Sequence, residues 1–355
     1  MDISSVKVLG MMSGTSLDGL DIALCTFERK NQTWNFTIND CETIKFEAEL
    51  LTDLCLAPSF NAEKFCNLHV EFGRFLGKSA KNFLEHRKLS ADIISSHGHT
   101  IFHQPGNNGF TCQLGHGAEI AALTGIPCIS DFRSLDVALG GQGAPLVPLG
   151  DQMLFSTYEA CLNLGGIANI SIHKNNKLTA FDICAVNQIL NHIAKWKNAD
   201  YDINGEIGKS GQRIENLFNS LNSIPYFNLT GPKSLGREWV EKEIFPLLNT
   251  NDHSTEDIAC TVYHHIQFQI EKILRQFSIQ TCLLSGGGTH NKFLLDLIQQ
   301  NSLTKLIIPE KKIIDFKESL IFAFLGLMRF IGENNTLSSV TGAKKNSSGG
   351  CIFLP

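Results

Sequence analysis

Three glycine-bearing clusters contain the residues best suited to bind phosphate. They read GMMSGTSLDG at 10–19, LNLGG at 162–166 and LSGGGTHN at 284–291. Backbone N–H groups approach phosphate oxygens closely where no Cβ intervenes, and hydroxyl groups add further donors. One such cluster is ordinary turn sequence, whereas three together predict a nucleotide-binding site. The candidate residues are Ser13, Gly14, Thr15, Ser16, Leu17, Asp18, Gly19, Gly165, Gly166, Gly286, Gly287 and Gly288.

Two carboxylates in and after the first cluster are suited to a divalent cation. These are Asp18 and Asp21. Mg²⁺ binds few protein carboxylates and keeps much of its hydration shell. We therefore predict a magnesium ion at Asp18 and Asp21, held through water.

Three histidines lie close together in the segment SHGHTIFH at 96–103. His97 and His99 would share one face of a strand, but no third ligand at zinc spacing and no H-E-x-x-H helix accompanies them. The cluster, which ends at His103, therefore predicts a polar cleft wall or hydrogen-bonded structural histidines rather than a metal site.

The tripeptide Gly208-Lys209-Ser210 resembles the end of a P-loop but lacks the rest of that motif. A P-loop needs a glycine five residues before its last glycine, and position 203 is Ile203. The preceding segment, 197–202, is polar rather than strand-like. We therefore expect a helix to begin after Gly208.

Strands and helices in both halves of the chain must position these residues. Short apolar runs predict strands, and apolar residues at helical spacing predict helices. In the first half, we expect strands or extended segments at 6–12, 20–27, 35–46, 92–96 and 127–130, and helices at 62–89 and 116–124. In the second half, we expect strands at 160–164, 167–172, 178–182 and 281–284, and helices at 187–197, at 256–277 and from near Asn291.

The chain is too long for one hydrophobic core. It has 355 residues, and a single core organises about 250 to 300. Each half also contains a hairpin with a glycine-bearing tip, which indicates two related halves. We predict an α/β fold with an N-terminal lobe at 1–130, joined by the C-terminal tail, and a C-terminal lobe at 131–355.

Charge and composition exclude several classes of function. There are 30 Lys and Arg against 35 Asp and Glu, a net charge of −5, which is unlike the basic footprint of a nucleic-acid-binding protein. The 11 cysteines form no C-x-x-C pair, which predicts free thiols. The sequence shows no signal peptide, and its longest uncharged apolar run near the C-terminus, 320–328, is too short for a bilayer. We predict a cytoplasmic protein with neither nucleic-acid nor membrane partners.

The order of the three clusters resembles the actin, hexokinase and heat-shock-ATPase superfamily. Eight strings further resemble the anhydro-N-acetylmuramic acid kinase family across nearly the whole chain. The strings are GMMSGTSLDGLD at 10–21, SSHGHT at 95–100, TGIPCISDFRSLDVALGGQGAPLVP at 124–148, LNLGGIANIS at 162–171, GPKSLGRE at 231–238, SGGGTHN at 285–291, ESLIFAF at 318–324 and VTGA at 340–343.

The resemblance implies a two-lobed actin-like ATPase fold, also called ribonuclease H-like, with a deep interlobe cleft. It implies ATP and Mg²⁺ as cofactors and an amino sugar as substrate. Enzymes of this family open the 1,6-anhydro bond of the sugar with water and phosphorylate O6, a reaction of murein recycling. The family also suggests a homodimer.

The resemblance implies that Asp182 is the general base. The family has an aspartate in a Phe-Asp-x-Gly-Pro-Gly-Asn context, and the match here runs from Phe181 to Asn187. Cys184-Ala185-Val186 replaces Gly-Pro-Gly, which implies a differently shaped loop because glycine alone reaches positive φ easily. The alternative role for Asp182 is an N-cap of the helix expected at 187–197.

Other roles follow from the resemblance residue by residue. Arg133 and Glu318 match positions that face the sugar; their alternative is a salt bridge between the lobes. His99 stands where the family has glutamine, and we expect it to contact the substrate. Lys233 and Arg237 either face phosphate or cap a helix. Two other functions stay open: a nucleotide-binding homologue with a regulatory role, and a kinase for a related sugar.

Overall fold

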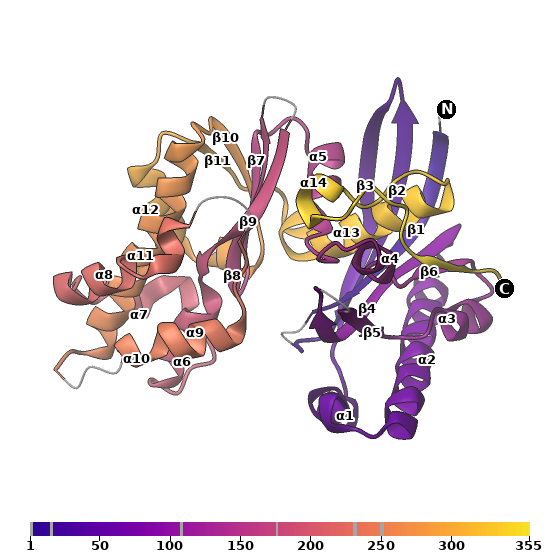
Figure 1. Ribbon diagram of the computed structural model, residues 1–355, viewed down its shortest axis with the longest axis horizontal. Coiled ribbons are helices and arrows are strands. Elements are labelled where there is room, and N and C mark those ends of the chain that lie inside the picture. The colour runs from indigo at the N-terminus through magenta and orange to yellow at the C-terminus, as the bar shows by residue number, and fades with distance from the viewer. Residues whose placement is uncertain (1–2, 15–16, 107–108, 175–176, 230–232, 249–251) are drawn as a thin grey trace. The chain divides into compact units, whose positions relative to one another are not determined.

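The computed structural model describes residues 3–14, 17–106, 109–174, 177–229, 233–248 and 252–355, and the chain divides into two compact units (Figure 1). Unit 1 comprises Met1–Phe155 and Phe316–Pro355, and unit 2 comprises Ser156–Asp315. The first division lies later than the boundary expected after residue 130. The intervening segment packs within unit 1, where the rings of Phe155 and Phe36 meet edge to face, 5.2 Å apart.

Unit 1 is a mixed sheet with helices on both faces. Its strands are β1 (Ile3–Ser13), β2 (Leu20–Lys30), β3 (Thr33–Ile44), β4 (Ile93–Gln104), β5 (Phe110–Leu114), β6 (Cys128–Ser130) and β12 (Cys351–Phe353). Its helices are α1 (Ala48–Leu56), the short η1 (Ala57–Ser59), α2 (Ala62–Arg87), α3 (Gly117–Thr124), α4 (Ser134–Ala138), α5 (Val147–Leu154) and α14 (Ser338–Thr341). Helix α13 (Lys311–Phe330) enters unit 1 from unit 2 and has a non-helical residue, Phe316, at the border.

Two helices bury the centre of this sheet from opposite sides. Phe72 and Leu76 of α2 pack with Leu9 of β1 in one hydrophobic core. On the other face, Gly10 of β1 touches α13 so closely that a Cβ there would overlap the carbonyl oxygen of Ser319. Because both faces are covered, β1 and β2 read as nearly continuous apolar runs.

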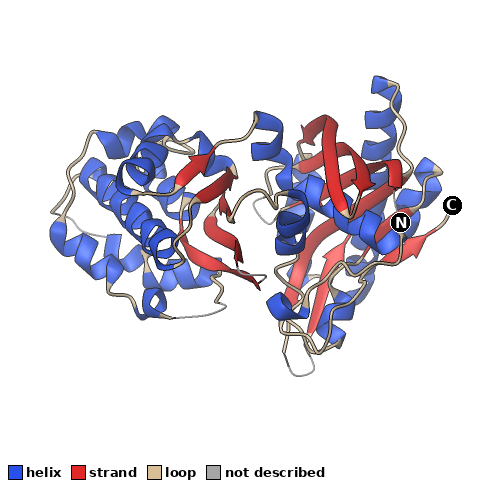
Figure 2. Ribbon diagram, turned by 90° about the horizontal axis from the view of Figure 1, so that it is seen from above, coloured by secondary structure: helices blue, strands red, loops and turns tan. Residues whose placement is uncertain are grey.

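Unit 2 repeats the arrangement around a second sheet. Its strands are β7 (Ala160–Leu164), β8 (Ile167–Lys174), β9 (Lys177–Ala185), β10 (Thr281–Ser285) and β11 (Lys305–Ile307). Its helices are α6 (Asn187–Lys195), η2 (Ile203–Gly205), α7 (Glu206–Lys209), α8 (Glu215–Asn222), η3 (Pro225–Asn228), α9 (Arg237–Glu243), α10 (Phe245–Leu248), α11 (Thr255–Gln276), η4 (Gly287–His290) and α12 (Lys292–Asn301). Figure 2 shows helices bordering the strands of each unit.

The two sheets share one topology, which confirms the predicted pair of related halves. Unit 1 has the order β12-β6-β4-β1-β2-β3, with β5 paired to β4, and unit 2 has the order β11-β10-β7-β8-β9. In each, three antiparallel strands come first in chain order. A later strand, β4 or β10, pairs in parallel with the first strand, and a further one, β6 or β11, pairs in parallel with that partner. The fold is therefore the predicted two-lobed α/β fold of actin-like ATPases, while the interlobe cleft stays a prediction.

The prediction that a helix begins after Gly208 is wrong. Gly208 lies inside α7, and the next helix, α8, begins only at Glu215. The carboxylate of Asp202 accepts hydrogen bonds from the N–H groups of Ile207 (2.9 Å) and Gly208 (3.1 Å). Since these bonds satisfy N–H groups at the start of a helix, the helical turn begins before Gly208.

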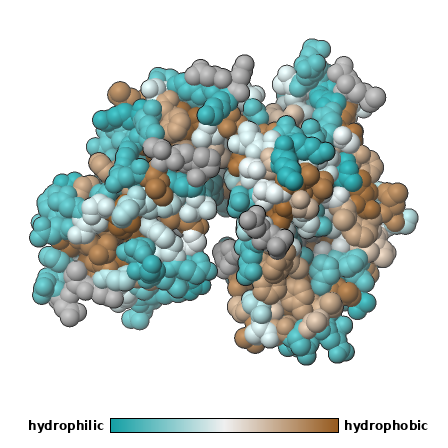
Figure 3. Space-filling model, in the orientation of Figure 1, coloured by the Kyte–Doolittle hydropathy of each residue, from teal (hydrophilic) through white to brown (hydrophobic). Residues whose placement is uncertain are grey.

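The helices and the surface test the expectation that the chain does not span a membrane. In the part of the chain that the structure describes, no helix combines the length and apolar character needed to cross a bilayer. Figure 3 shows hydrophilic side chains over much of the face of unit 2 that is drawn, and a broader area of hydrophobic side chains on unit 1.

Candidate functional site

The end of strand β1 is tied to strand β4 by a pair of predicted site residues. Ser13 Oγ lies 2.8 Å from Nδ1 of His99, and both residues are buried. Burial lowers the pKa of His99 to about 4, so its imidazole is neutral near pH 7. His99 thus holds the base of the β1–β2 turn, and its contact with a substrate stays a prediction.

The described residues of the turn between β1 and β2 include two with positive φ, Leu17 and Gly19. Thr15 and Ser16 lie outside the described residues. The N–H of Leu17, which has φ 60°, donates to the carbonyl of Gly14 (3.2 Å). Gly19 has φ 151°, and a Cβ there would lie 2.7 Å from the carbonyl oxygen of Ile44. Glycine is therefore required where the turn enters β2.

Of the two predicted magnesium ligands, Asp18 lies in this turn and Asp21 lies on strand β2 directly after it. Asp18 is exposed, and the half-buried Asp21 accepts a hydrogen bond from the Thr43 hydroxyl at 2.5 Å. Among the described residues, no group of three or more His, Cys, Asp or Glu side chains is arranged to hold a metal ion. A site of one or two carboxylates completed by water suits Mg²⁺ and would not form such a group.

The three clustered histidines each have their own partner. His97 Nδ1 lies 3.0 Å from the carbonyl oxygen of Gly98, so Nδ1 carries the proton and Nε2 accepts from Arg133 Nε (2.9 Å). His103 Nδ1 lies 3.1 Å from the hydroxyl of Thr111. For the described residues, the interpretation as hydrogen-bonded histidines is confirmed.

The structure brings Arg133 and Glu318 into one electrostatic environment in unit 1. Burial lowers the pKa of Arg133 to about 10, and the charges of Glu318 and Asp136 oppose this shift. The surrounding protein raises the pKa of Glu318 by desolvation, although its side chain keeps solvent access, and Lys317 and Arg133 oppose the rise. Because both residues belong to unit 1, an ion pair between them would not link the lobes.

In unit 2, the other two glycine clusters meet at the carboxyl edge of the sheet. Strands β7 and β10 are parallel, with Asn163 opposite Ser285. A Cβ on Gly286, which has φ +83°, would overlap Asn163 Oδ1, and one on Gly288 would lie 2.8 Å from the carbonyl oxygen of Leu164. The clusters can pack this closely only because they lack side chains.

The backbone of Gly165 and Gly166 also holds the start of helix α6. The carbonyl of Gly166 accepts from the N–H of Val186 (2.8 Å), and that of Gly165 accepts from Asn187 (3.2 Å). Gly166 and Gly287 remain exposed, while Gly165 and Gly286 are half-buried. The predicted phosphate-binding glycines of unit 2 thus lie together with part of their backbone accessible.

We expect Gly286→Ala to disturb this arrangement far more than the same change at Gly332. The added Cβ at Gly286 has no space beside Asn163, and alanine is strained at positive φ. Gly332 has a similar φ of +78° but no heavy atom within 4 Å of an added Cβ. Thermal unfolding and the Kd for ATP measure the effect: both should change in Gly286→Ala, with Gly332→Ala showing the cost of φ alone. Equal behaviour of the two variants would contradict the close packing.

Asp182 lies on β9 with its carboxylate held by a neighbouring loop. The N–H of Leu235 donates to Asp182 Oδ2 (2.8 Å), and the backbone N–H of Asp182 donates to the carbonyl of Lys233 (2.9 Å). The Tyr226 hydroxyl donates to the backbone oxygen of Asp182 (2.8 Å). Burial raises the pKa of Asp182 to about 6, and the Leu235 hydrogen bond opposes the rise.

The N-cap alternative for Asp182 is wrong. Helix α6 begins at Asn187, its N-cap residue is Val186, and no side-chain hydrogen bond caps it. Strand β9 continues through Ala185, which pairs with Ile167, so the Cys184-Ala185-Val186 segment is buried strand end rather than an open loop. The Asp182 carboxylate therefore does not cap this helix.

Sequence reasoning missed the residues that hold Asp182. Tyr226 and the backbone of Leu235 carry no motif of their own, since a backbone N–H can belong to any residue type. The sequence feature that pointed to this loop was the string at 231–238. Lys233 and Arg237 in that string were expected either to face phosphate or to cap a helix. Lys233 Nζ donates to the carbonyl of Tyr226 (3.1 Å) and lies 4.4 Å from its ring centroid, while Arg237 pairs with Glu241 on the surface.

Comparison with known proteins gives the family. The sequence profile described as "Anhydro-N-acetylmuramic acid kinase" matches residues 6–355. The chain belongs to this family. Proteins of that name from Sulfurimonas denitrificans and Actinobacillus pleuropneumoniae are 31% and 33% identical to it, each over 97% of this chain and 98% of the relative. One from Bacillus thuringiensis is 31% identical over 98% and 99%.

Solved structures give a weaker likeness. The ADPNP-bound activator of the 2-hydroxyisocaproyl-CoA dehydratase from Clostridium difficile aligns with 90% of this chain and 94% of its own, at 15% identity and a TM-score of 0.45. The family assignment does not rest on this likeness. It rests on full-length sequence similarity, and the resemblance seen in the eight strings is thereby confirmed.

Proposed function

We propose that this anhydro-N-acetylmuramic acid kinase family member opens 1,6-anhydro-N-acetylmuramic acid with water and phosphorylates it at O6, using ATP. The observation that carries the proposal is the environment of the Asp182 carboxylate. Its carboxylate is held by one backbone N–H, does not cap a helix and has a pKa of about 6. A base with a pKa near the working pH is well suited to accept a proton from water.

The proposed reaction couples the opening of the 1,6-anhydro bond to phosphoryl transfer. Asp182 takes a proton from water as the water oxygen bonds to C1 of the sugar. The bond between C1 and the bridging O6 breaks, and O6 bonds to the γ-phosphorus of ATP as the bond to the β-phosphate oxygen breaks. The products are ADP and the 6-phosphorylated, ring-opened sugar. In this proposal the neutral His97 holds the Arg133 guanidinium in place, and Arg133 and Glu318 orient the sugar.

The magnesium ion, the phosphate-binding glycines and the homodimer are proposed from the family resemblance and from residue chemistry. A magnesium ion at Asp18 and Asp21 would neutralise charge on the phosphoryl oxygens. The glycines of the two turns supply backbone N–H groups close to phosphate. A homodimer is proposed from the family resemblance, and sedimentation velocity measures it. The cytoplasmic location stays a prediction.

We expect turnover to fall in acid because Asp182 must be ionised to act as a base. Burial raises the pKa of Asp182 from 3.8 to about 6, so the charged form is present above that pH and is lost below it. The rate constant kcat/KM should therefore fall about tenfold per pH unit below the pKa. A profile that stays flat down to about pH 4.5 would exclude this base.

A direct assay tests the function. The protein is incubated with ATP, Mg²⁺ and 1,6-anhydro-N-acetylmuramic acid in water enriched in ¹⁸O. We expect ADP and sugar phosphate in equal amounts, with the label in the hydroxyl group at C1. Calorimetric binding of ATP without any turnover would instead favour the regulatory homologue, and turnover of a different anhydro sugar would favour the related kinase.

A further inference from the structure

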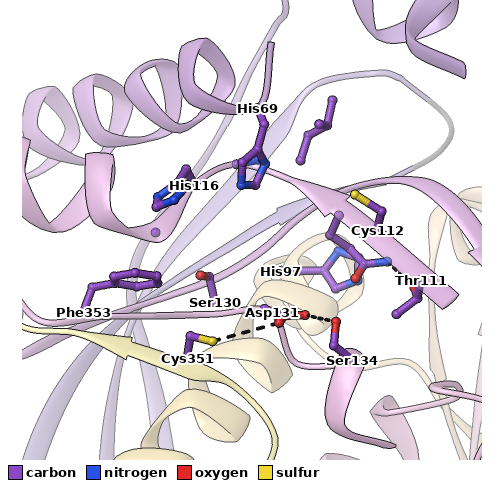
Figure 4. Close-up of a pocket in the computed structure, with 14 residues that line it drawn as sticks. His69, His97, Thr111, Cys112, His116, Ser130, Asp131, Ser134, Cys351 and Phe353 are labelled. Carbon is purple, nitrogen blue, oxygen red and sulfur yellow. Dashed lines mark hydrogen bonds between the residues drawn. The ribbon is translucent and has the colours of Figure 1, made fainter. Parts of the chain in front are cut away.

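Each unit contains buried polar side chains that take no direct part in the proposed reaction. In unit 1, His97 lines the recess drawn in Figure 4 and accepts a hydrogen bond from Arg133, so this recess adjoins the predicted sugar contact. In unit 2, Asp202, Tyr263 and Asn291 are joined by hydrogen bonds and are at most 9% exposed. We call these three residues the hydrogen-bond chain, and no step of the proposed reaction uses it.

The hydrogen-bond chain runs from an amide through a hydroxyl to a carboxylate. Asn291 Nδ2 donates to the hydroxyl oxygen of Tyr263 (2.7 Å), and this hydroxyl donates in turn to Asp202 Oδ2 (3.0 Å). Because each donor in such a chain polarises the next, the two buried bonds strengthen each other. Burial and the charge of Asp202 raise the pKa of the Tyr263 hydroxyl, so it keeps its proton and remains a donor.

One end of the hydrogen-bond chain holds the glycine turn that follows β10. Asn291 comes directly after this turn, and its side-chain oxygen caps helix α12. The backbone N–H of Asn291 donates to the carbonyl of Gly288 (3.0 Å), while the N–H of Gly286, at the start of the turn, donates to the carbonyl of Ile314 (3.2 Å). Gly287 lies between these two points and is exposed. The turn is therefore fixed on both sides of its accessible residue.

The other end of the hydrogen-bond chain is anchored in a second glycine-bearing segment. The Asp202 carboxylate accepts hydrogen bonds from two N–H groups in the first turn of α7. A Cβ at Gly208 would overlap the ring of Tyr263, and one at Gly205 would lie 2.8 Å from Asn291 Oδ1. The tripeptide that begins at Gly208 and resembles the end of a P-loop therefore packs against the hydrogen-bond chain.

We propose that Tyr263, together with Asp202 and Asn291, holds the glycine turn in the shape that binds ATP. The proposal rests on the proposed function, in which backbone N–H groups of this turn lie close to phosphate. A backbone N–H has no side-chain rotamer that could compensate for a shift, so its contribution to binding depends on how firmly the turn is supported. The three side chains act through the turn and are positioning residues.

Tyr263→Phe tests the chain at its centre. The variant keeps the ring that packs against Gly208 and Phe293 but removes the hydroxyl that joins the other two side chains. We expect the Kd for ATP, measured by calorimetry on the whole protein, to rise about tenfold, the effect of about one lost hydrogen bond. Tyr201→Phe is the matched control, because it removes the same atom from a side chain that is 60% exposed. Equal Kd values for Tyr263→Phe and the unchanged protein would overturn the proposal.

Asn291→Asp separates helix capping from positioning. Aspartate caps a helix as well as asparagine does, so α12 keeps its N-cap. Aspartate has no amide hydrogen to donate to Tyr263, and we therefore expect the Kd for ATP to rise in this variant too. In the double variant Tyr263→Phe with Asn291→Asp, the two increases should combine to less than their product, because both changes break the same bond. An unchanged Kd in Asn291→Asp would mean that Asn291 only caps the helix, which contradicts the proposal.

Steady-state kinetics and thermal unfolding distinguish positioning from a purely structural role. We expect Tyr263→Phe to raise KM for ATP and to leave KM for the anhydro sugar unchanged. A lower Tm with an unchanged Kd for ATP would make the hydrogen-bond chain structural and overturn the proposal. Calorimetry with ATP needs no turnover. In a protein that binds ATP but never consumes the anhydro sugar, the proposed function fails, and weaker ATP binding by Tyr263→Phe still supports the positioning role.

Discussion

Asp182→Asn is expected to reduce kcat by a factor of about 10² to 10⁴, the usual contribution of a general base. Asparagine keeps an oxygen for the N–H of Leu235 and the backbone bonds to Lys233 and Tyr226, so the loop around position 182 should persist. The carboxylate that accepts the proton is lost. Stopped-time assays of ADP and sugar phosphate measure the change, with Asp296→Asn on the exposed face of α12 as the control.

The stability of the same variant distinguishes a catalytic carboxylate from a structural one. Because the pKa of Asp182 is raised on folding, the native state binds the proton more tightly than the unfolded chain, and stability falls as pH rises from about 4 to 6. Above this range the cost is constant, at most about 3 kcal/mol and less because the group is partly exposed. Asp182→Asn removes the cost, so Tm at about pH 8 should be unchanged or higher. A lower Tm with retained activity would mark Asp182 as structural.

The repeated sheets could be predicted because their central strands have a strong local signal. The apolar runs at 6–12 and 160–164 each lead to a glycine-bearing turn, and both proved to be the first strand of a sheet. Strand β12 has no such signal. Its three residues form a strand because they pair with β6, more than two hundred positions earlier in the chain.

The division into units depends on packing that sequence patterns do not carry. Helix α13 is apolar along most of its length, which fits burial in either unit. The structure assigns it to unit 1 from Phe316 onward because it packs against β1 at Gly10. The segment between residue 130 and Phe155 joins unit 1 for a similar reason: Phe155 contacts a ring on β3.

Part of the candidate site could be predicted because its glycine clusters carry a local sequence signal. Glycine clusters mark close approaches of backbone, and Gly286 and Gly288 do pack against the end of β7. The N–H that holds the Asp182 carboxylate could not be predicted, because Leu235 contributes only its backbone. The histidine pattern gave the type of environment but not the partners, since the partner of His99, Ser13, is on another strand.

Lys317→Met is expected to destabilise unit 1 by about 3–5 kcal/mol, the typical effect of leaving one member of a buried ion pair alone. Lys317 Nζ lies 2.8 Å from Asp151 Oδ1, and the two side chains are only 5% and 3% exposed. Removing the lysine leaves a buried carboxylate close to a second one, since the charge of Asp151 already raises the pKa of Glu318. Urea unfolding together with hydrogen exchange of peptides from α5 and α13 measures the loss within unit 1.

The double variant Lys317→Met with Asp151→Leu completes this test. If the loss comes from an uncompensated charge, removing that charge should restore most of the stability, because buried ion pairs exchange for apolar pairs at little cost. Lys311→Met is the control: it breaks the exposed pair with Asp315 and should change stability by less than about 1 kcal/mol. If Lys317→Met is no less stable than this control, the buried pair contributes nothing. If instead the double variant folds well but binds the sugar poorly, Lys317 and Asp151 serve to fix the neighbouring Glu318 rather than the fold.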